Sequence, residues 1–387
     1  MNTMIYLDNH STTKLDSSVL ERILPFLKEE FGNPSAKSHP LGWHAAEAVD
    51  DARRMIAKIL DITPREVLFT SGATESNNLI IQGFFKVPEN IQKYRFLTQA
   101  TEHKSVLSIA KLFQSNSQSL DRPKQTRVLG VDAAGMMSLV ELEEELQKGP
   151  ALVSVMLGNN EIGTINDVKT IYEICDKYES LLHLDAAQAP GKVDLKNISY
   201  DFLSLSAHKF HGPKGVGALI VKNRSPRLKF APLMVGGTQE MELRPGTTNV
   251  AGIVGMAYAL ELAQKQRAQL VDHWKQLRIH FLSELETRGI GFEVNGSLSH
   301  RLENNLSLTF THLLSSEILK ALMGKVALST GSACSTGAVS PSHVLKAIGL
   351  TDDQCARTVR LGMGPDTTKE QMTQVVDLLS HVAATGV

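Results

Sequence analysis

Short apolar segments alternate with longer segments of helical spacing through the first part of the chain, and this alternation constrains the fold more than any other feature. The apolar segments are typical of buried strands and lie at residues 67–70, 95–98, 127–131, 152–157, 181–185, 202–206 and 216–221. Helical spacing occurs at residues 73–86, 104–113, 139–147 and 168–178. Strands that alternate with helices predict an α/β fold with a large, mostly parallel, seven-stranded sheet covered by helices on both faces.

The character of the chain changes after about residue 253. A long helical segment continues to about residue 288 and is followed by short apolar segments at residues 305–310, 326–329 and 358–361. We predict a large domain at residues 15–258 and a smaller α+β domain formed by residues 1–14 and 259–387. A chain of 387 residues is long enough for two such domains.

The composition disfavours several classes of protein. The 40 Lys and Arg residues nearly balance the 41 Asp and Glu residues, which argues against bulk binding to nucleic acid or to an anionic membrane. The apolar stretches are far shorter than the ~20 residues of a membrane-spanning helix, and the first ten residues lack the pattern of a signal peptide. The three cysteines form no C-x-x-C pair, so we expect neither a disulfide framework nor a metal site, and we expect a reducing, cytoplasmic compartment.

Polar residues directly follow five of the predicted strands, at residues 71–75, 101–104, 158–161, 185–188 and 206–209. Ligands of open parallel sheets bind at the carboxyl ends of the strands. These segments supply a glycine turn into a helix at Gly72, an imidazole at His103, an amide at Asn160, a carboxylate at Asp185 and an amine at Lys209. We expect these groups to form one site.

Each of these features also has a simple structural interpretation. The turn at residues 71–74 is either an ordinary helix cap or a phosphate seat made by free amide groups and the helix dipole. Asp185 is either a solvated carboxylate or a buried one that needs a cationic partner. Lys209 is either a surface lysine or, because it lies between an apolar strand and a glycine–proline turn, a desolvated amine. The nucleotide-binding patterns G-x-G-x-x-G and G-x-x-x-x-G-K-[ST] do not occur.

A phosphate seat, a lysine and a strand-end carboxylate together indicate pyridoxal phosphate. This cofactor needs a lysine for its Schiff base and a carboxylate to keep its ring nitrogen protonated, so that the ring can withdraw electrons from the substrate Cα. The prediction depends on the combination, because each residue alone is a weak signal.

A second group of candidate residues lies in the predicted small domain. The small residues and glycines of segment 331–337 predict a mobile surface loop, at about residues 329–342, that carries Cys334. Cys334 lacks large apolar neighbours, which favours an exposed nucleophile, whereas Cys175 and Cys355 are expected to be buried. Arg360 is either a surface ion-pair partner or a bidentate clamp on a substrate carboxylate.

Sequence blocks along nearly the whole chain match one family in the same order. They lie at residues 6–13, 31–35, 69–76, 101–104, 159–163, 183–188, 206–209, 212–215, 244–247 and 332–334. Examples are Tyr6-Leu-Asp-Asn-His-Ser-Thr-Thr13, Ser206-Ala-His-Lys209 and Ser332-Ala-Cys334. In these blocks the chain resembles the group I cysteine desulfurases of the NifS and IscS type, which are class V aminotransferases of pyridoxal-phosphate fold type I.

The resemblance implies an aspartate-aminotransferase-like fold and a homodimer with active sites at the subunit interface. It also implies conversion of L-cysteine to L-alanine, with the sulfur left as a persulfide on Cys334. From there the sulfur would pass to an acceptor protein for iron–sulfur cluster assembly or for thio-modification.

The resemblance further implies a role for each matching residue. Lys209 would hold the cofactor and then act as base at the substrate Cα, while His103 would stack on the ring and move protons, including that of the substrate thiol. Asp185 would bind the pyridine nitrogen and Gln188 the phenolic oxygen. The phosphate would be bound by Ala73, Thr74, Ser206, His208 and the partner subunit's Thr247. The substrate carboxylate would be bound by Arg360 and Asn160, and Asn160 would also contact the cofactor.

Two departures from the family pattern alter these expectations. Pro245 stands where a serine is usual, so the dimer contacts of segment 236–247 are expected to differ. The chain also stops at Val387, soon after its last predicted helix, so we expect it to lack the C-terminal tail with which housekeeping members dock a scaffold protein.

Three other functions stay open from the sequence. A selenocysteine lyase, or another lyase or aminotransferase of the same fold, would share the cofactor residues and need no loop cysteine. A serine acyl-transferring hydrolase would use the S-x-x-K pattern at residues 206–209, but the S-D-N and K-T-G companions of that pattern do not occur. The third is an interaction protein without activity. The presence of Lys209, Asp185, His103 and Cys334 argues against it, because such a protein would not need them.

Overall fold

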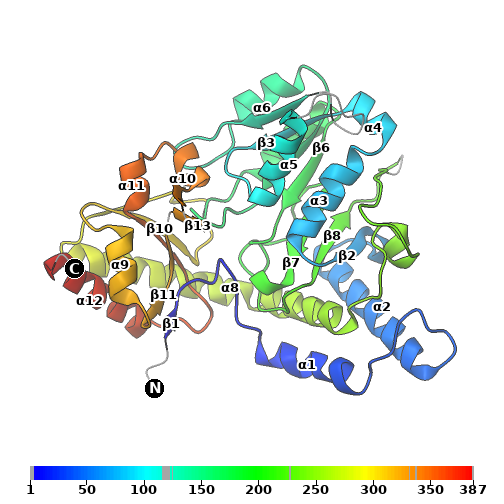
Figure 1. Cartoon of the computed structure of the whole chain (residues 1–387), viewed down its shortest axis with the longest axis horizontal. Coiled ribbons are helices and arrows are strands. Elements are labelled where there is room, and N and C mark those ends of the chain that lie inside the picture. Colours follow the sequence, from blue (N-terminus) through cyan, green and yellow to red (C-terminus); the bar gives the residue numbers. More distant parts are fainter. Residues whose placement is uncertain are drawn as a thin grey trace.

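A seven-stranded sheet forms the centre of the larger part of the molecule (Figure 1). The computed structural model describes residues 4–115, 123, 125–225, 228–330, 332–335 and 338–385. The strand order is β2-β8-β7-β6-β5-β3-β4. The strands are β2 (Val67–Thr70), β3 (Arg95–Gln99), β4 (Thr126–Leu129), β5 (Ala151–Met156), β6 (Leu181–Asp185), β7 (Phe202–Ser206) and β8 (Gly217–Val221).

Six of these strands run in the same direction. Neighbouring strands pair in parallel from β4 to β7, whereas β8 is antiparallel to both β7 and β2. The predicted mostly parallel, seven-stranded sheet is therefore confirmed. The carboxyl ends of the six strands meet at one edge of the sheet, which is where a ligand site is expected.

Helices cover both faces of the sheet, as predicted. Successive residues of a strand point to opposite faces, so Val67 and Phe69 of β2 enter one apolar core and Leu68 enters another. The first core packs under α1 (Ser17–Lys28), α2 (Pro40–Leu60), α6 (Leu139–Leu146), α7 (Val168–Lys177) and the beginning of α8 (Val250–Thr287). The second packs under α3 (Ala73–Phe84), α4 (Pro88–Lys93) and α5 (Lys104–Ser115). None of the helices in the described ranges is long and apolar enough to cross a membrane.

A second, smaller unit has its own core around an antiparallel sheet. Its strands follow the order β12-β15-β10-β9 and are β9 (Phe292–Val294), β10 (Asn305–Phe310), β12 (Ser329–Thr330) and β15 (Thr358–Gly362). The helices of this unit are α9 (Ser315–Leu322), α10 (His343–Ala347), α11 (Asp352–Ala356) and α12 (Lys369–Thr385).

Helix α8 connects the two cores. Its residues up to Leu260 belong to the core of the large sheet, and those from Trp274 onward belong to the core of the small unit. The predicted domain boundary at residue 258 falls inside this continuous helix and stays a prediction.

The N-terminal segment passes from the small unit to the large sheet (dark blue in Figure 1). Strand β1 (Ile5–Tyr6) pairs in parallel with β11 (Val326–Ala327), and Ile5 and Leu7 are buried in the small core. Farther along, the backbone N–H of Thr13 donates to the carbonyl oxygen of His208 at 3.0 Å. The segment therefore contacts both units and lies across the edge where the strands end.

The structure differs from the sequence-based expectation around Cys334. The segment predicted as a loop contains an antiparallel hairpin of β13 (Ser332–Ser335) and β14 (Ala338–Pro341), in which Cys334 is opposite Val339. The Ser, Val and Ala residues of these two strands are compatible with extended backbone, so small size alone did not specify a loop. Residues 331, 336 and 337, and the side chains of the hairpin up to residue 340, lie outside the described part.

We predict that Gly217→Ala destabilises the large sheet. A Cβ at Gly217 would lie 2.4 Å from the carbonyl oxygen of Leu205 and 2.5 Å from the Cα of Gly72, both of them backbone atoms that cannot move independently. Such overpacking costs about 1–3 kcal/mol, measurable as a lower urea midpoint. The matched control is Gly130→Ala, whose Cβ would meet only the end of the Glu141 side chain, at 3.2 Å. Equal midpoints for the two variants would contradict the prediction.

Candidate active site

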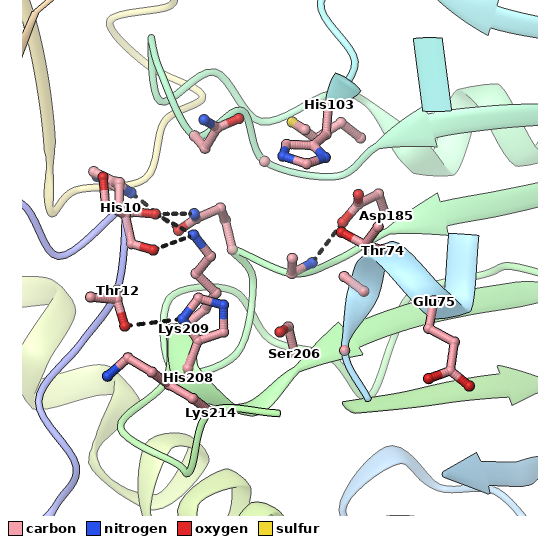
Figure 2. Close-up of a pocket in the computed structure, with 18 of the residues that line it drawn as sticks. His10, Thr12, Thr74, Glu75, His103, Asp185, Ser206, His208, Lys209 and Lys214 are labelled. Carbon is pink, nitrogen blue, oxygen red and sulfur yellow. Dashed lines mark hydrogen bonds between the residues drawn. The ribbon is translucent and has the colours of Figure 1, made fainter. Parts of the chain in front are cut away.

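The carboxyl ends of the parallel strands open into a cavity of about 660 Å³ (Figure 2). Its wall combines the first turn of α3, the ends of β5, β6 and β7, the N-terminal segment and Arg360 of β15. Both units of the molecule therefore contribute to it.

Ten of the residues singled out from the sequence line this cavity. They are Ala73, Thr74, His103, Asn160, Asp185, Gln188, Ser206, His208, Lys209 and Arg360. Thr247 is exposed and is not among the lining residues of its own chain. Cys334 lies in β13, and the position of its side chain is outside the described part.

Sequence reasoning missed several lining residues, above all His10, Ser11, Thr12 and Lys214. The first three belong to a polar run that directly follows the buried Leu7. The available signal was the family match of blocks 6–13 and 212–215, which contain these four residues, but none of them was assigned a role in the site from the sequence.

The N-terminus of α3 forms one end of the cavity. Gly72 has φ 149° and ψ 178°, a conformation that residues with a Cβ rarely adopt, and it provides no side-chain cap for the helix. Gly72, Ala73 and Thr74 all line the cavity, next to Ser206, His208 and Lys214. Uncapped first-turn amides beside hydroxyl and cationic groups are suited to an anion.

Asp185 lies at the end of β6 and is 3% exposed. One of its oxygens accepts a hydrogen bond from Asn77 Nδ2 at 2.8 Å, and the other accepts from the backbone N–H of Ala187 at 3.0 Å. Both donors are neutral, and within the described ranges no Lys, Arg or His forms an ion pair with Asp185. A buried carboxylate of this kind is suited to a cationic group of a ligand.

Lys209 points from the turn Ala207–Lys209 after β7 toward the N-terminal segment. Its Nζ donates to the carbonyl oxygens of His10 at 2.6 Å and Ser11 at 2.8 Å. Burial and the nearby Arg360 lower the pKa of Lys209 to about 8, although Asp185 and Asp8 oppose the shift. A substantial fraction of this amine is therefore neutral near physiological pH.

Two histidines beside Lys209 are neutral at the same pH. Burial lowers the pKa of His10 well below its usual range, and burial with the charges of Lys209 and Lys214 lowers the pKa of His208 to about 4. His10 Nδ1 is 3.1 Å from Gln188 Oε1, and Gln188 Nε2 donates to the His10 carbonyl oxygen at 2.9 Å. One N–H of the Gln188 amide thus stays available for a ligand.

His103 lies on the opposite side of the cavity from Lys209 (Figure 2). Its Nδ1 is 2.8 Å from Ser105 Oγ and accepts from the backbone N–H of Ser105 at 3.1 Å. Burial lowers the pKa of His103, whereas the charge of Asp185 raises it. The preceding Glu102 is fully buried, and burial and the charge of Asp185 raise its pKa well above the usual range.

Arg360 extends from β15 into the cavity and is fixed by several acceptors. Its Nη2 shares two N–H groups among three acceptors, Asp8 Oδ1 at 2.9 Å, Ser11 Oγ at 2.9 Å and Ser329 Oγ at 2.8 Å. Its Nη1 donates to the Asn160 carbonyl oxygen at 3.0 Å, and its Nε is buried without a partner. One Nη1–H of the guanidinium is therefore left without an acceptor among the described residues.

The aminotransferase class-V family model matches residues 5–375 of this chain. The chain belongs to the class-V aminotransferase family. It is 39% identical over 384 residues to the cysteine desulfurase IscS of Neisseria meningitidis, an alignment that covers 98% of this chain and 92% of that protein. A solved NifS-like protein superposes with a TM-score of 0.89 at 34% identity and covers 99% of this chain and 100% of its own. SspA, solved in complex with cysteine, has a TM-score of 0.77 at 32% identity and covers 95% of this chain and 100% of its own.

Membership of this family implies a pyridoxal-phosphate-dependent enzyme, and the residues of the cavity fit that cofactor. Gly72 leaves the space that a Cβ would fill, 3.3 Å from Ser206 Oγ, beside the uncapped amides of α3. No cationic side chain among the described residues pairs with Asp185, and a protonated ring nitrogen would supply that positive charge. Lys209 offers an amine of lowered pKa. Among the described residues, no group of three His, Cys, Asp or Glu side chains could hold a metal ion.

We predict that acylation of Lys209 in the cofactor-free protein has a midpoint near pH 8 rather than at the ordinary lysine value of 10.5. Only the neutral amine reacts with an acylating reagent, and peptide mass spectrometry at a series of pH values measures the reacted fraction. Arg360→Met should raise this midpoint, because the guanidinium lowers the pKa of Lys209. The exposed Arg54 provides the matched control, Arg54→Met. A midpoint near 10.5, or one indifferent to Arg360→Met, would contradict the prediction.

Proposed function

We propose that this chain is a cysteine desulfurase, which converts L-cysteine to L-alanine and transfers the sulfur to Cys334 as a persulfide. The observation that supports it best is one cavity in which a lysine of lowered pKa, a buried carboxylate without a cation and an uncapped helix N-terminus lie together with Arg360. The similarity to IscS and to SspA in complex with cysteine supports this substrate and this reaction.

Pyridoxal phosphate would be held by groups along the floor of the cavity. The amides of Ala73 and Thr74, with Ser206 and His208, would bind its phosphate. Asp185 would bind the ring nitrogen, and the free N–H of Gln188 would reach the phenolic oxygen. His103 would lie against the ring and Lys209 would bind the aldehyde carbon. When bound, the cofactor withdraws electrons from the substrate Cα and so labilises its substituents.

The chain's own residues would bind the substrate and move its protons. The unused Nη1–H of Arg360, with the side chain of Asn160, would bind the cysteine carboxylate. The Nζ of Lys209 would take the Cα proton, which requires the neutral amine that its lowered pKa provides.

The sulfur transfer balances without an external oxidant or reductant. The bond between the substrate Cβ and sulfur breaks, and a sulfur–sulfur bond to Cys334 forms. Of the two thiol hydrogens, one from the substrate and one from Cys334, one completes the methyl group of alanine and the other is kept by the persulfide. The other two cysteines are buried, and burial raises the pKa of both thiols, so neither suits this step.

We also propose a homodimer in which the partner subunit's Thr247 contacts the phosphate. Thr247 is exposed and does not reach the cavity of its own chain. Helix α1 and the residues after it expose apolar side chains at helical spacing, namely Leu20 at 46%, Leu24 at 38%, Leu27 at 61% and Phe31 at 71%. An apolar stripe of this size is typical of an interface. The need to keep Cys334 reduced favours the cytoplasm.

A selenocysteine lyase is the second candidate, because it would use the same cavity and no cysteine nucleophile. The sulfur acceptor would be a protein with an accessible thiol, either in iron–sulfur cluster assembly or in thio-modification. A direct contact with nucleic acid or membrane has no support in the nearly balanced charge of the chain.

We predict that Cys334→Ala lowers persulfide formation from L-cysteine at least about 10²-fold, as expected when a nucleophile is removed. Absorption of the bound cofactor should be unchanged, because no cofactor contact is lost. Persulfide is measured by alkylation and mass spectrometry, and alanine by chromatography. Cys355→Ala is the matched control, since this cysteine is buried in the small unit away from the cavity. Alanine formation from selenocysteine alone, equal in Cys334→Ala and the unmodified protein, would favour the lyase instead.

A further inference from the structure

We propose that Asn77 and Ser105 are positioning residues that connect Asp185 to His103 in one hydrogen-bond relay and keep the proton of neutral His103 on Nε2. The proposal deepens the proposed function, since it assigns the state in which His103 meets the substrate. Neither Asn77 nor Ser105 lines the cavity, so both would act through the residues that do.

The Asn77 amide is the centre of the relay. It lies in the first half of α3, is fully buried, and its Nδ2 has two neighbours. One is Asp185 Oδ2 at 2.8 Å and the other is Ser105 Oγ at 2.9 Å. An amide nitrogen carries two N–H groups, so Asn77 can donate to both at once. Turning the amide over would place its oxygen against the Asp185 carboxylate, which excludes the opposite orientation.

The direction of the next hydrogen bond follows from the first. Because Ser105 Oγ accepts from Asn77, its own O–H is free to donate, and the nearest acceptor is His103 Nδ1 at 2.8 Å. The backbone N–H of Ser105 donates to the same nitrogen at 3.1 Å. A nitrogen that receives two donors must present its lone pair, so the neutral imidazole carries its proton on Nε2.

The charged groups around His103 are consistent with a neutral ring. Burial is the main influence and lowers its pKa, and the charges of Lys209, His343 and Lys104 lower it further. The charge of Asp185 opposes them. The relay adds to this, since protonation of Nδ1 would break both hydrogen bonds from Ser105.

The relay determines what His103 can do at the cavity. Nε2 makes no hydrogen bond within the described part of the chain, and the ring lines the cavity, so the Nε2–H is directed toward a ligand. His103 therefore meets the substrate as a hydrogen-bond donor and proton source, rather than as the acceptor of the substrate thiol proton. It can accept at Nε2 only after the ring has given that proton away.

A purely structural role for Ser105 is the alternative. His103 precedes α5, and its Nδ1 caps the helix by accepting the backbone N–H of Ser105. That cap uses no side-chain atom of Ser105 or Asn77. Removing the two side chains therefore separates a relay from a cap, because the backbone hydrogen bond is kept in every variant.

The test is nuclear magnetic resonance of the full-length protein labelled with ¹⁵N-histidine, recorded with and without cofactor. Two-bond proton–nitrogen correlations report the tautomer, and the variant His103→Gln identifies the signal. In the unmodified protein we expect the Nε2–H form. Ser105→Ala should lower the ratio of the Nε2–H to the Nδ1–H form about fivefold, the equivalent of one hydrogen bond, and should raise the midpoint of the His103 titration. Ser108→Ala, an exposed serine of the same helix, is the matched control.

Asn77→Ala tests whether Asn77 acts through Ser105. We expect it to change the His103 signal in the unmodified background and to have no further effect in Ser105→Ala, because coupled residues are not additive. An Nδ1–H tautomer in the unmodified protein, or Ser105→Ala spectra equal to those of Ser108→Ala, would overturn the proposal. These readouts need no turnover, so they are separate from persulfide formation, which tests the proposed function.

Discussion

The buried carboxylate of Asp185 is the group on which the rest of the site depends. It stands at the end of a central strand, and its only hydrogen-bond donors among the described residues are the neutral groups of Asn77 and Ala187. Removing a carboxylate from water costs several kcal/mol unless a positive charge compensates it. Burial and the charge of Asp185 raise the pKa of the neighbouring Glu102 well above its usual range, which favours the neutral form of that carboxyl group. The cavity is thus electrostatically incomplete until a cationic group of a ligand faces Asp185.

Around Lys209, on the other side of the cavity, several cationic side chains lie close together. Burial and Lys209 lower the pKa of Lys192, whose Nζ donates to the Lys209 carbonyl oxygen at 3.2 Å, to about 7. Burial and Arg360 lower that of Lys209 to about 8. The histidines beside them are neutral, so lysines and arginine determine the local charge. A ligand with a cationic group would compensate Asp185, and an anionic carboxylate would compensate the cations around Arg360, so the two ends call for groups of opposite charge.

The large sheet and most of the cavity wall could be predicted from the sequence. Both follow from local patterns, namely short apolar segments and the polar residues directly after them. Strands β2, β6, β7 and β10 have the predicted bounds, and polar residues after parallel strands must meet at one edge. The contribution of His10 and Ser11 could not be predicted in this way, since their backbone carbonyl oxygens bind Lys209 and a carbonyl carries no residue identity. The relay through Asn77 and Ser105 could not be predicted from the sequence either. It depends on the packing of α3 against α5, which brings together residues that are far apart in the chain.

The N-terminal segment connects Lys209 with Arg360 and with the strand that precedes Cys334. Its His10 and Ser11 carbonyls bind the Lys209 amine, while its Asp8 binds Arg360 and Ser329. Ser329 begins β12, five residues before Cys334. The amine, the guanidinium and the strand that leads to the cysteine are therefore fixed by one short stretch of chain that lies between the two cores. Ser329 pairs with Arg360 in the small sheet, whereas Lys209 and Asp185 follow strands of the large sheet, so the N-terminal segment joins groups of both units at the cavity.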